Sequence, residues 1–498
     1  MSKHLDTQQE GPARRKVMTR RNFVKGAAAA AVVVPAAAAM QSARTEPAAD
    51  AQETADLEKY RALGGWVEKP DDMQPALEGD VSADVVIAGA GFAGLSAAIE
   101  LAKQGAKVVV LEREFAGFGA SGRNAGYLGG GIALDFDLIL KGVSKEQAKK
   151  IARYYEDAVP FVEGKLKEHG IDCDYNQSGL MRAGVHPSQE GRVREGVRNS
   201  AEYGIQSEFL DEAQMRARGI PPAFLFAEYS PRGGTLHPGK YVMGLRRAAL
   251  RAGVKLYENT PLLSYTEGPV VQVKTPRGSA SAPVLMLATN AYTPQLGLLG
   301  DKVVPLRVSA IETEPLSPAQ LKSLGWAGRE GIMTAHWVME SHRITAQNTL
   351  LVTTKRLHYP YGSKTPNVPD YDQYRELRIA MHDRFPTLKD VAVRACWSGY
   401  ISFANDALPV VGTTGANQNI YYSAGCSGHG VAAQSMVGHM IAQRIHGTEP
   451  ELLAALRHET PSTLPEPLRW CVLSGALGGA AVMDDWTNRK ARETAGSA

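Results

Sequence analysis

Residues 84–112 constrain the fold more than any other stretch of this 498-residue sequence. Residues 85–88 form a short apolar run rich in β-branched side chains, which is typical of a strand buried on both faces. Three glycines follow in the spacing G-x-G-x-x-G. We expect Gly89 to allow a tight turn, Gly91 to let a ligand approach the backbone, and Gly94 to let helix and strand pack closely. The pattern therefore predicts a strand that turns sharply into a helix.

The second half of this stretch completes a strand–helix–strand unit. The helix should end at Gly105, and residues 108–111 form a second apolar run that ends at Glu112. A carboxylate at that position can accept both hydroxyls of an adenosine ribose, and the amides at the helix N-terminus favour a diphosphate. Because all these parts occur in order, the stretch predicts a dinucleotide site. The acidic ending favours FAD or NAD over NADP.

Charge and cysteine spacing exclude several other classes of protein. The formal net charge is +3, but residues 1–43 hold seven basic and two acidic residues, so the rest of the chain is net −2. A folded body with that charge has no electrostatic basis for binding nucleic acid. The cysteines form no CxxC or Cys/His cluster, so we expect no metal site. A disulfide is an alternative that a chain of this length does not need.

The first 43 residues are typical of an export signal. Residues 19–25 contain paired arginines with an aromatic residue two places on, a modest apolar run covers residues 26–34, and an A-x-A pattern occurs near residues 37–39. These features predict a twin-arginine signal, cleaved near Ala39 to Ala43, that delivers the folded protein to the periplasm through the twin-arginine export machinery. The alternative is a membrane anchor, but the alanine-rich run is too short and weakly apolar, so we expect no stable membrane span.

A second glycine-rich loop, G-F-G-A-S-G-R-N-A-G at residues 117–126, follows the first unit. So many small residues around one arginine suit a backbone wrapped around a phosphate or a ring system. Together, the two motifs resemble the glycine/D-amino-acid oxidase family of FAD enzymes, and most closely its branch of γ-glutamylputrescine oxidase and related amine oxidases. Later motifs agree with this resemblance and follow in family order at residues 234–241, 288–293, 397–412 and 425–430.

The resemblance implies an α/β fold, α+β overall. A Rossmann-like FAD-binding domain should be joined to a second, substrate domain built on an antiparallel or mixed sheet that covers the flavin. Within it, a capping box at residues 144–147 predicts a helix through Ala158. We expect the segments to alternate between the two domains: signal 1–43, linker 44–80, FAD-binding 81–170, substrate 171–235, FAD-binding 236–299, substrate 300–395, FAD-binding 396–447, and a tail 448–498 that packs on the body.

The same resemblance implies which residues hold the cofactor. They lie in the two glycine-rich loops, at the end of the second strand, and in the later motifs. The expected FAD-binding residues are Gly89, Gly91, Phe92, Ala93, Gly94, Glu112, Arg113, Ala120, Ser121, Arg123, Asn124, Ala125, Gly126, Thr289, Gly399, Asp406, Gly425, Ser427, Gly428, His429 and Gly430.

Candidate catalytic residues are His429, in the G-H-G turn, and His336 and Trp337, in the segment expected to cover the flavin. Each has an ordinary structural alternative, since His429 can simply shape its turn and the other two can be packing or surface residues. The segment of His336 and Trp337 also contains His342, Arg343, His358 and Tyr359. We expect at least one of these six residues to contact the substrate.

Two departures from sarcosine-type relatives refine these expectations. Those relatives place a basic residue two positions after the G-H-G turn to hold a substrate carboxylate, and the position here is Ala432. They attach flavin through a cysteine seven residues before the aspartate that corresponds to Asp406, and that position is Gly399 rather than Cys396. We therefore expect non-covalent FAD. Cys426 stands where relatives carry an aromatic residue, either as a widening of the site or as an inert buried thiol.

These observations predict an FAD-dependent oxidase or deaminase that acts on a small amine or amino acid. A hydride equivalent leaves the carbon next to nitrogen, the imine hydrolyses, and dioxygen is reduced to hydrogen peroxide. Three alternatives stay open at this point. They are a dehydrogenase that passes electrons to a quinone or redox protein, an NAD-dependent reductase, and a flavin-binding protein with a non-catalytic role such as maturation of a partner.

Overall fold

The computed structural model describes residues 61–62, 64–131 and 143–496. The expected signal and cleavage region lie outside these residues. A six-stranded sheet, parallel except for one antiparallel pair at its edge, contains the first strand–helix–strand unit. In order across the sheet, its strands are β10 (Lys255–Tyr257), β4 (Val108–Leu111), β3 (Val85–Ala88), β14 (Val284–Leu287), β21 (Ile420–Ala424) and β20 (Val410–Thr414).

Both faces of this sheet are covered, which explains why its strands read as continuous apolar runs. On β3, Val85 and Ile87 pack with helix α3 (Phe92–Lys103), whereas Val86 and Ala88 pack against a four-stranded sheet on the other side. That second sheet has the order β11 (Ser264–Thr266), β12 (Val271–Lys274), β13 (Gly278–Ala282) and β2 (Gly79–Ser82).

A nine-stranded mixed sheet forms the other half of the structure, as the sequence predicts. Most pairs are antiparallel, and β1/β19 and β16/β6 are parallel. Its order is β1 (Arg61–Ala62), β19 (Val393–Ala404), β15 (Val303–Thr313), β18 (Leu350–Thr354), β17 (Glu340–Ile344), β16 (Gly331–Thr334), β6 (Leu180–Gly184), β8 (Phe226–Ser230) and β7 (Glu208–Leu210). A short pair joins β5 (Tyr127–Leu128) to β9 (Gly234–Thr235).

Two expected segment boundaries need correction. Strand β19 crosses the boundary placed between residues 395 and 396, because it pairs along its whole length with β15. The expected linker 44–80 contributes β1 to the nine-stranded sheet and β2 to the four-stranded sheet, so its described part is structural. The other domain boundaries stay a prediction.

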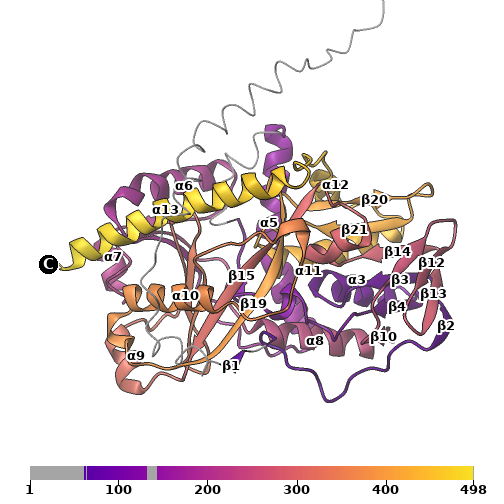
Figure 1. Ribbon diagram of the computed structural model, residues 1–498, viewed down its shortest axis with the longest axis horizontal. Coiled ribbons are helices and arrows are strands. Elements are labelled where there is room, and N and C mark those ends of the chain that lie inside the picture. The colour runs from indigo at the N-terminus through magenta and orange to yellow at the C-terminus, as the bar shows by residue number, and fades with distance from the viewer. Residues whose placement is uncertain (1–60, 63, 132–142, 497–498) are drawn as a thin grey trace, which may run out of the picture. The chain divides into compact units, whose positions relative to one another are not determined.

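Helices cover the sheets unequally. Helices α3, α5 (Lys145–His169), α8 (Pro238–Arg251) and α11 (Gly430–Ile445) pack together with the six-stranded sheet. Helix α10 (Tyr371–Arg384) packs on the nine-stranded sheet. Figure 1 shows β3, β4, β14 and α3 gathered on the right of the view and α10 with β15 and β19 toward its left. The remaining helices are α6 (Glu190–Glu202), α7 (Glu212–Ala217), α9 (Pro318–Leu324), α12 (Glu451–Leu456) and α13 (Leu468–Gly496).

Helix α5 is longer than its capping signal indicates. Ser144 caps it, accepting from the Gln147 amide at 3.2 Å, but the Gln147 side chain donates to Ala455 O instead of closing the capping box. The helix continues beyond Ala158 through Pro160, because its next turns bury further apolar side chains in the core. Ser144 thus marks the start of the helix, packing carries it past Ala158, and Gly170, in the left-handed conformation with φ +61°, caps its end.

The described part of the tail packs on the body through apolar residues near the start of α13 and through polar residues farther along. Near its start, Leu473 and Leu477 of α13 contact a small apolar cluster. Farther along, the buried residues are polar, Asp484 and Asn488 among them, while Val472 and Met483 are exposed. Within the part of the chain that the structure describes, no helix combines the length and apolarity that crossing a membrane requires.

Candidate functional site

The three glycines at the turn between β3 and α3 stand where a side chain would clash with its neighbours. Gly89 has φ +104°, and a Cβ there would lie 2.7 Å from Ala288 O. A Cβ on Gly91 would lie 2.8 Å from Ser121 Oγ, and one on Gly94 would lie 2.0 Å from Gly89 O. The first two glycines therefore open space in front of the helix N-terminus, and Gly94 serves the close packing of helix on strand.

Glu112, at the end of β4, is fixed in front of this turn by two backbone amides. Its Oε2 accepts from Ala90 N at 2.8 Å and its Oε1 from Glu114 N at 3.1 Å. Burial raises the pKa of the Glu112 carboxyl above its usual value, against the lowering effect of these two amides. The carboxylate retains further lone pairs that can accept ligand hydroxyls.

Two cavities meet at this position. The dinucleotide cavity, about 210 Å³, lies among the N-termini of α3 and α11, the end of β4 and the loop before Asn124. The sheet cavity, about 320 Å³, lies between that loop and the nine-stranded sheet and is largely apolar. Both cavities are lined by the same six residues at their junction, which are Ala120, Asn124, Tyr400, Ile401, Gly428 and Val431.

Most of the expected site residues line one cavity or the other. The dinucleotide cavity is lined by Gly89, Gly91, Phe92, Ala93, Glu112, Arg113, Ala120, Ser121, Asn124, Thr289, Gly428 and Gly430. The sheet cavity is lined by Ala120, Arg123, Asn124, Ala125, Trp337, Gly399, Ser427, Gly428 and His429. The structure thus brings together segments that are more than 300 residues apart in sequence.

Five expected residues line neither cavity. Asp406 instead bonds His458 Nε2 at 2.8 Å, and His336 is buried with its Nδ1 2.7 Å from Thr334 Oγ1. Gly425 and Gly126 have φ of +70° and +77° and are enclosed by neighbouring backbone, so they shape turns behind the site. The fifth is Gly94.

The dinucleotide cavity is also bordered by residues that the sequence did not single out, among them Phe118, Leu262, Tyr292, Gln295 and Gln434. Phe118 and Tyr292 lie inside the motifs at residues 117–126 and 288–293, and Gln434 lies shortly after the motif at 425–430, so the sequence could have indicated them. Leu262 and Gln295 belong to segments whose position against the cavity depends on tertiary packing. Cys426 also lines this cavity, with Asn290 Nδ2 3.4 Å from its Sγ.

The polar groups of the dinucleotide cavity fit an anionic dinucleotide with a polar ring. The N-cap residues of α3 and α11, Gly91 and His429, provide no side-chain cap. Phe92 N donates to Ser121 Oγ at 3.0 Å, and the other first-turn amides at both N-termini are available to a ligand. Three buried polar atoms on lining residues have no protein partner among the described residues, namely Asn290 Oδ1, Gln434 Nε2 and Arg123 Nη2. These atoms are available to a ligand.

Alternation along the strands decides which side chains face the sheet cavity. Met333, Ser341 and Thr353 are neighbours across β16, β17 and β18 and line the cavity. The next residues in register, among them His342, point to the opposite face, where they contact the helix-covered core. Cys396 lies on that opposite face as well, paired with Ile311. Of the set expected to contact substrate, Trp337 is the member found in the cavity wall.

Two ionisable side chains border the sheet cavity near its junction with the dinucleotide cavity. Burial lowers the pKa of His429, whose Nδ1 is 3.3 Å from Ser427 O, so the imidazole is neutral near pH 7. The Arg123 guanidinium donates to Phe118 O at 2.8 Å and to Ser398 O at 2.9 Å, leaving Nη2 unpartnered. The wall of the sheet cavity therefore combines one fixed positive charge with one neutral imidazole.

Comparison with known proteins decides what this arrangement is. Residues 84–444 match the family described as FAD dependent oxidoreductase, abbreviated DAO. This chain belongs to that family. It is an FAD-dependent oxidoreductase, and the two uncapped helix N-termini, Glu112 and the glycine-rich turn are the parts of the chain that would hold FAD. The family match ends at residue 444, before α13 begins.

Relatives and solved structures agree with this family. The chain is 30% identical over 380 residues to gamma-glutamylputrescine oxidoreductase of Escherichia coli (strain K12), covering 74% of this chain and 85% of that protein. It is 29% identical over 377 residues to the probable oxidoreductase OrdL of Haemophilus influenzae, covering 74% and 84%. The fold is similar to that of glycine oxidase from Geobacillus kaustophilus, with a TM-score of 0.63, 20% identity, and coverage of 74% and 96%.

Proposed function

We propose that this protein oxidises the C–N bond of a small amine or amino acid and uses dioxygen as electron acceptor. The observation that carries the proposal is the junction of the two cavities. A substrate carbon in the sheet cavity would lie next to Gly428, Val431 and Asn124, which also border the cavity built for FAD. The relative named gamma-glutamylputrescine oxidoreductase supports an amine as the substrate.

The reaction needs a dry, oriented site at this junction. When bound, FAD supplies the acceptor for the hydride equivalent that leaves the carbon next to the substrate nitrogen. The apolar wall of the sheet cavity excludes water, and neutral His429 can accept a hydrogen bond or a proton from the ammonium group. Water then hydrolyses the imine to a carbonyl compound and ammonia or an amine, and dioxygen takes up two electrons and two protons to give hydrogen peroxide.

Positive potential at the junction comes from the chain itself. The amides that begin α11 lie at the junction and favour negative charge there, and the cationic Arg123 lines the sheet cavity beside it. Ala432 is buried inside α11 and offers no charge, so a carboxylate on the substrate would not be held from that position. Arg123 Nη2 is a cationic group free to hold one instead.

Absorbance of the purified protein tests this proposal. We expect flavin bands that bleach when one amine of a panel is added without air, and that return on admission of air as peroxide forms. Bleaching that persists in air would assign a dehydrogenase that uses another acceptor. Protein that cannot be reconstituted with FAD, or flavin that no amine or amino acid bleaches, would contradict the proposal.

We propose that FAD is bound without a covalent bond. Gly399 occupies the cavity wall where a cysteine would be needed, and Cys396 points to the opposite face of the sheet. Acid precipitation of the holoprotein should therefore release yellow flavin to the supernatant. A yellow pellet would mean that another residue attaches the flavin. Cys426 would then be the first residue to replace by serine.

We propose export to the periplasm by the twin-arginine machinery, on the basis of residues 19–43 and their basic charge. Cell fractionation should find the shortened protein in the periplasm. Replacement of Arg20 and Arg21 by lysine should retain the full-length form in the cytoplasm, whereas lysine at Arg14 and Arg15, outside the motif, should leave export unchanged. Equal export of both variants would contradict this route.

A further inference from the structure

The turn between β16 and β17, residues 335–339, forms part of the rim of the sheet cavity. Trp337, Val338 and Met339 all line the cavity, and the Trp337 side chain is 58% exposed, which places it at the mouth. The base of the turn is closed within the hairpin, because Glu340 N donates to Thr334 Oγ1 at 2.8 Å. The amides at the tip need a partner from elsewhere.

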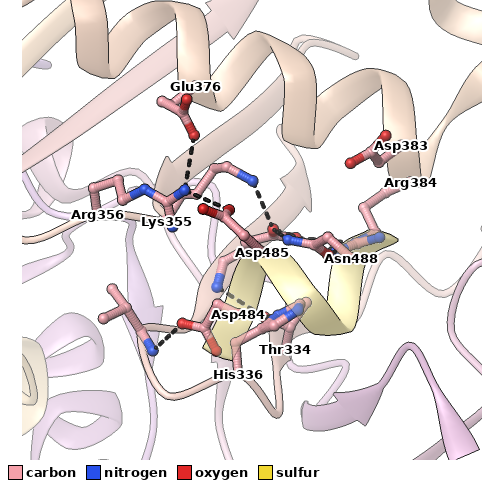
Figure 2. A network of polar contacts seen from close by, with 12 residues as sticks. Thr334, His336, Lys355, Arg356, Glu376, Asp383, Arg384, Asp484, Asp485 and Asn488 are labelled. Carbon is pink, nitrogen blue, oxygen red and sulfur yellow. Dashed lines mark hydrogen bonds and ion pairs between the residues drawn. The ribbon is translucent and has the colours of Figure 1, made fainter. Parts of the chain in front are cut away.

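Helix α13 supplies that partner. Asp484, 3% exposed, accepts from Trp337 N at its Oδ1 and from Val338 N at its Oδ2, each at 2.8 Å. One carboxylate thus accepts from two consecutive backbone amides, an arrangement stronger than hydrogen bonds between neutral groups. Figure 2 shows Asp484 at this position on the C-terminal helix.

The part of α13 that follows Asp484 is anchored by a polar network. Asp485 Oδ1 lies 2.5 Å from Arg356 Nη2, which also pairs with Glu376 of α10 at 3.2 Å. Asn488, one turn farther on, accepts from Arg384, and Arg384 Nε is 2.9 Å from Glu340 Oε2. Figure 2 shows these side chains converging from α13, α10 and the strands. The network fixes the position of α13, and the hydrogen bonds of Asp484 connect the helix to the turn at the cavity rim.

We propose that Asp484 is a positioning residue for substrate binding: through it, α13 holds the rim turn in the shape that the sheet cavity presents to substrate. The proposal rests on the function proposed above, because it takes the sheet cavity as the substrate site. It adds an element beyond the family match, so that relatives without α13 would shape this rim differently. Asp484 contacts backbone amides alone, so it affects binding through Trp337 and Val338 and takes no part in the chemical step.

Anaerobic stopped-flow reduction of the FAD-loaded protein by its amine separates these effects. For Asp484→Ala and the milder Asp484→Asn, we expect the apparent Kd for the amine to rise at least fivefold and the limiting reduction rate to stay within twofold. The matched control is Arg492→Gln, which removes the α13 pair with Asp383 of α10 at 3.0 Å but touches no cavity residue. It should leave both constants unchanged. A lower limiting rate at unchanged Kd would overturn the proposal.

Hydrogen exchange, measured by mass spectrometry without any substrate, tests whether Asp484 holds the amides of Trp337 and Val338. The peptide that contains Trp337 and Val338 should exchange at least tenfold faster in both Asp484 variants and at the original rate in Arg492→Gln. Unchanged exchange would overturn the proposal. Faster exchange with no amine able to reduce even the unaltered protein would instead contradict the proposed function, so the two failures are distinguishable.

Discussion

Glu112 already has protein partners at both carboxylate oxygens, which fixes its orientation before any ligand binds. A charged acceptor held at the end of a strand, beside a helix N-terminus, is suited to ribose hydroxyls. Its neighbour Glu114 differs, because its carboxylate pairs with the Arg113 side chain at 3.8 Å. Glu112 and Glu114 therefore carry the same chemical group, but backbone amides orient the carboxylate of Glu112, whereas that of Glu114 pairs with a side chain.

Glu112→Gln should weaken FAD binding by about 10-fold or more, since it replaces a charge-assisted acceptor that contributes about 1.5–3 kcal/mol. The measurement is the FAD dissociation constant of the apoprotein by flavin fluorescence quenching. Glu114→Gln is the control and should keep the original affinity. Equal affinities for all three proteins would show that Glu112 does not contact the cofactor.

At the scale of elements, the contact between α3 and α11 brings the two cavity-facing helix N-termini together. A Cβ on Gly438 of α11 would lie 2.1 Å from Ala93 O of α3, so the backbones touch. Gly164, also inside a helix, has no atom within 4 Å of its Cβ position. Glycine is therefore needed for close packing at position 438 of α11 and is not needed for packing at position 164 of α5.

Gly438→Ala should lower the free energy of unfolding by more than about 2 kcal/mol, because a backbone carbonyl must move, and should reduce FAD retention. Gly164→Ala should raise the free energy of unfolding by about 0.5–1 kcal/mol through helix propensity. Urea unfolding of both variants checks this pair. A stable, FAD-retaining Gly438→Ala variant would show that α3 and α11 can separate without cost to the site.

For the whole molecule, buried neutral histidines link stability to pH. Burial lowers the pKa of both His336 and His237 to about 4. Because the unfolded chain binds protons on these side chains below about pH 6.5, the stabilisation is fully present above that pH and is lost as the pH falls toward 4. The exposed His446 offers a comparison.

His336→Asn should reduce the loss of unfolding free energy between pH 7 and pH 5 by about 2 kcal/mol, the linkage of one buried imidazole with this shift. Urea unfolding at the two pH values gives the difference, and His446→Asn controls for removal of an imidazole. Because His336 lines neither cavity, kcat should change less than threefold. An unchanged pH dependence would mean that His336 is protonated in the folded protein.

The sequence by itself determined the nucleotide half of this protein. The parts of the strand–helix–strand unit lie within 29 consecutive residues, and contacts inside that unit or at the end of its neighbouring strand require glycine at positions 89 and 94. Local conformational preference and spacing are sufficient for such a unit. The motif loop around Arg123 was found for the same reason, because its small residues are contiguous.

Tertiary structure alone decided the substrate half. The wall of the sheet cavity comes from strands spread between Leu180 and Phe403, and the phase of their alternation depends on which face α10 covers. A shift of one residue exchanges the two faces of a strand, which is why Ser341 lines the cavity and His342 does not. Asp484 reaches the rim only because α13 packs across the sheet, and no local pattern records that long-range contact.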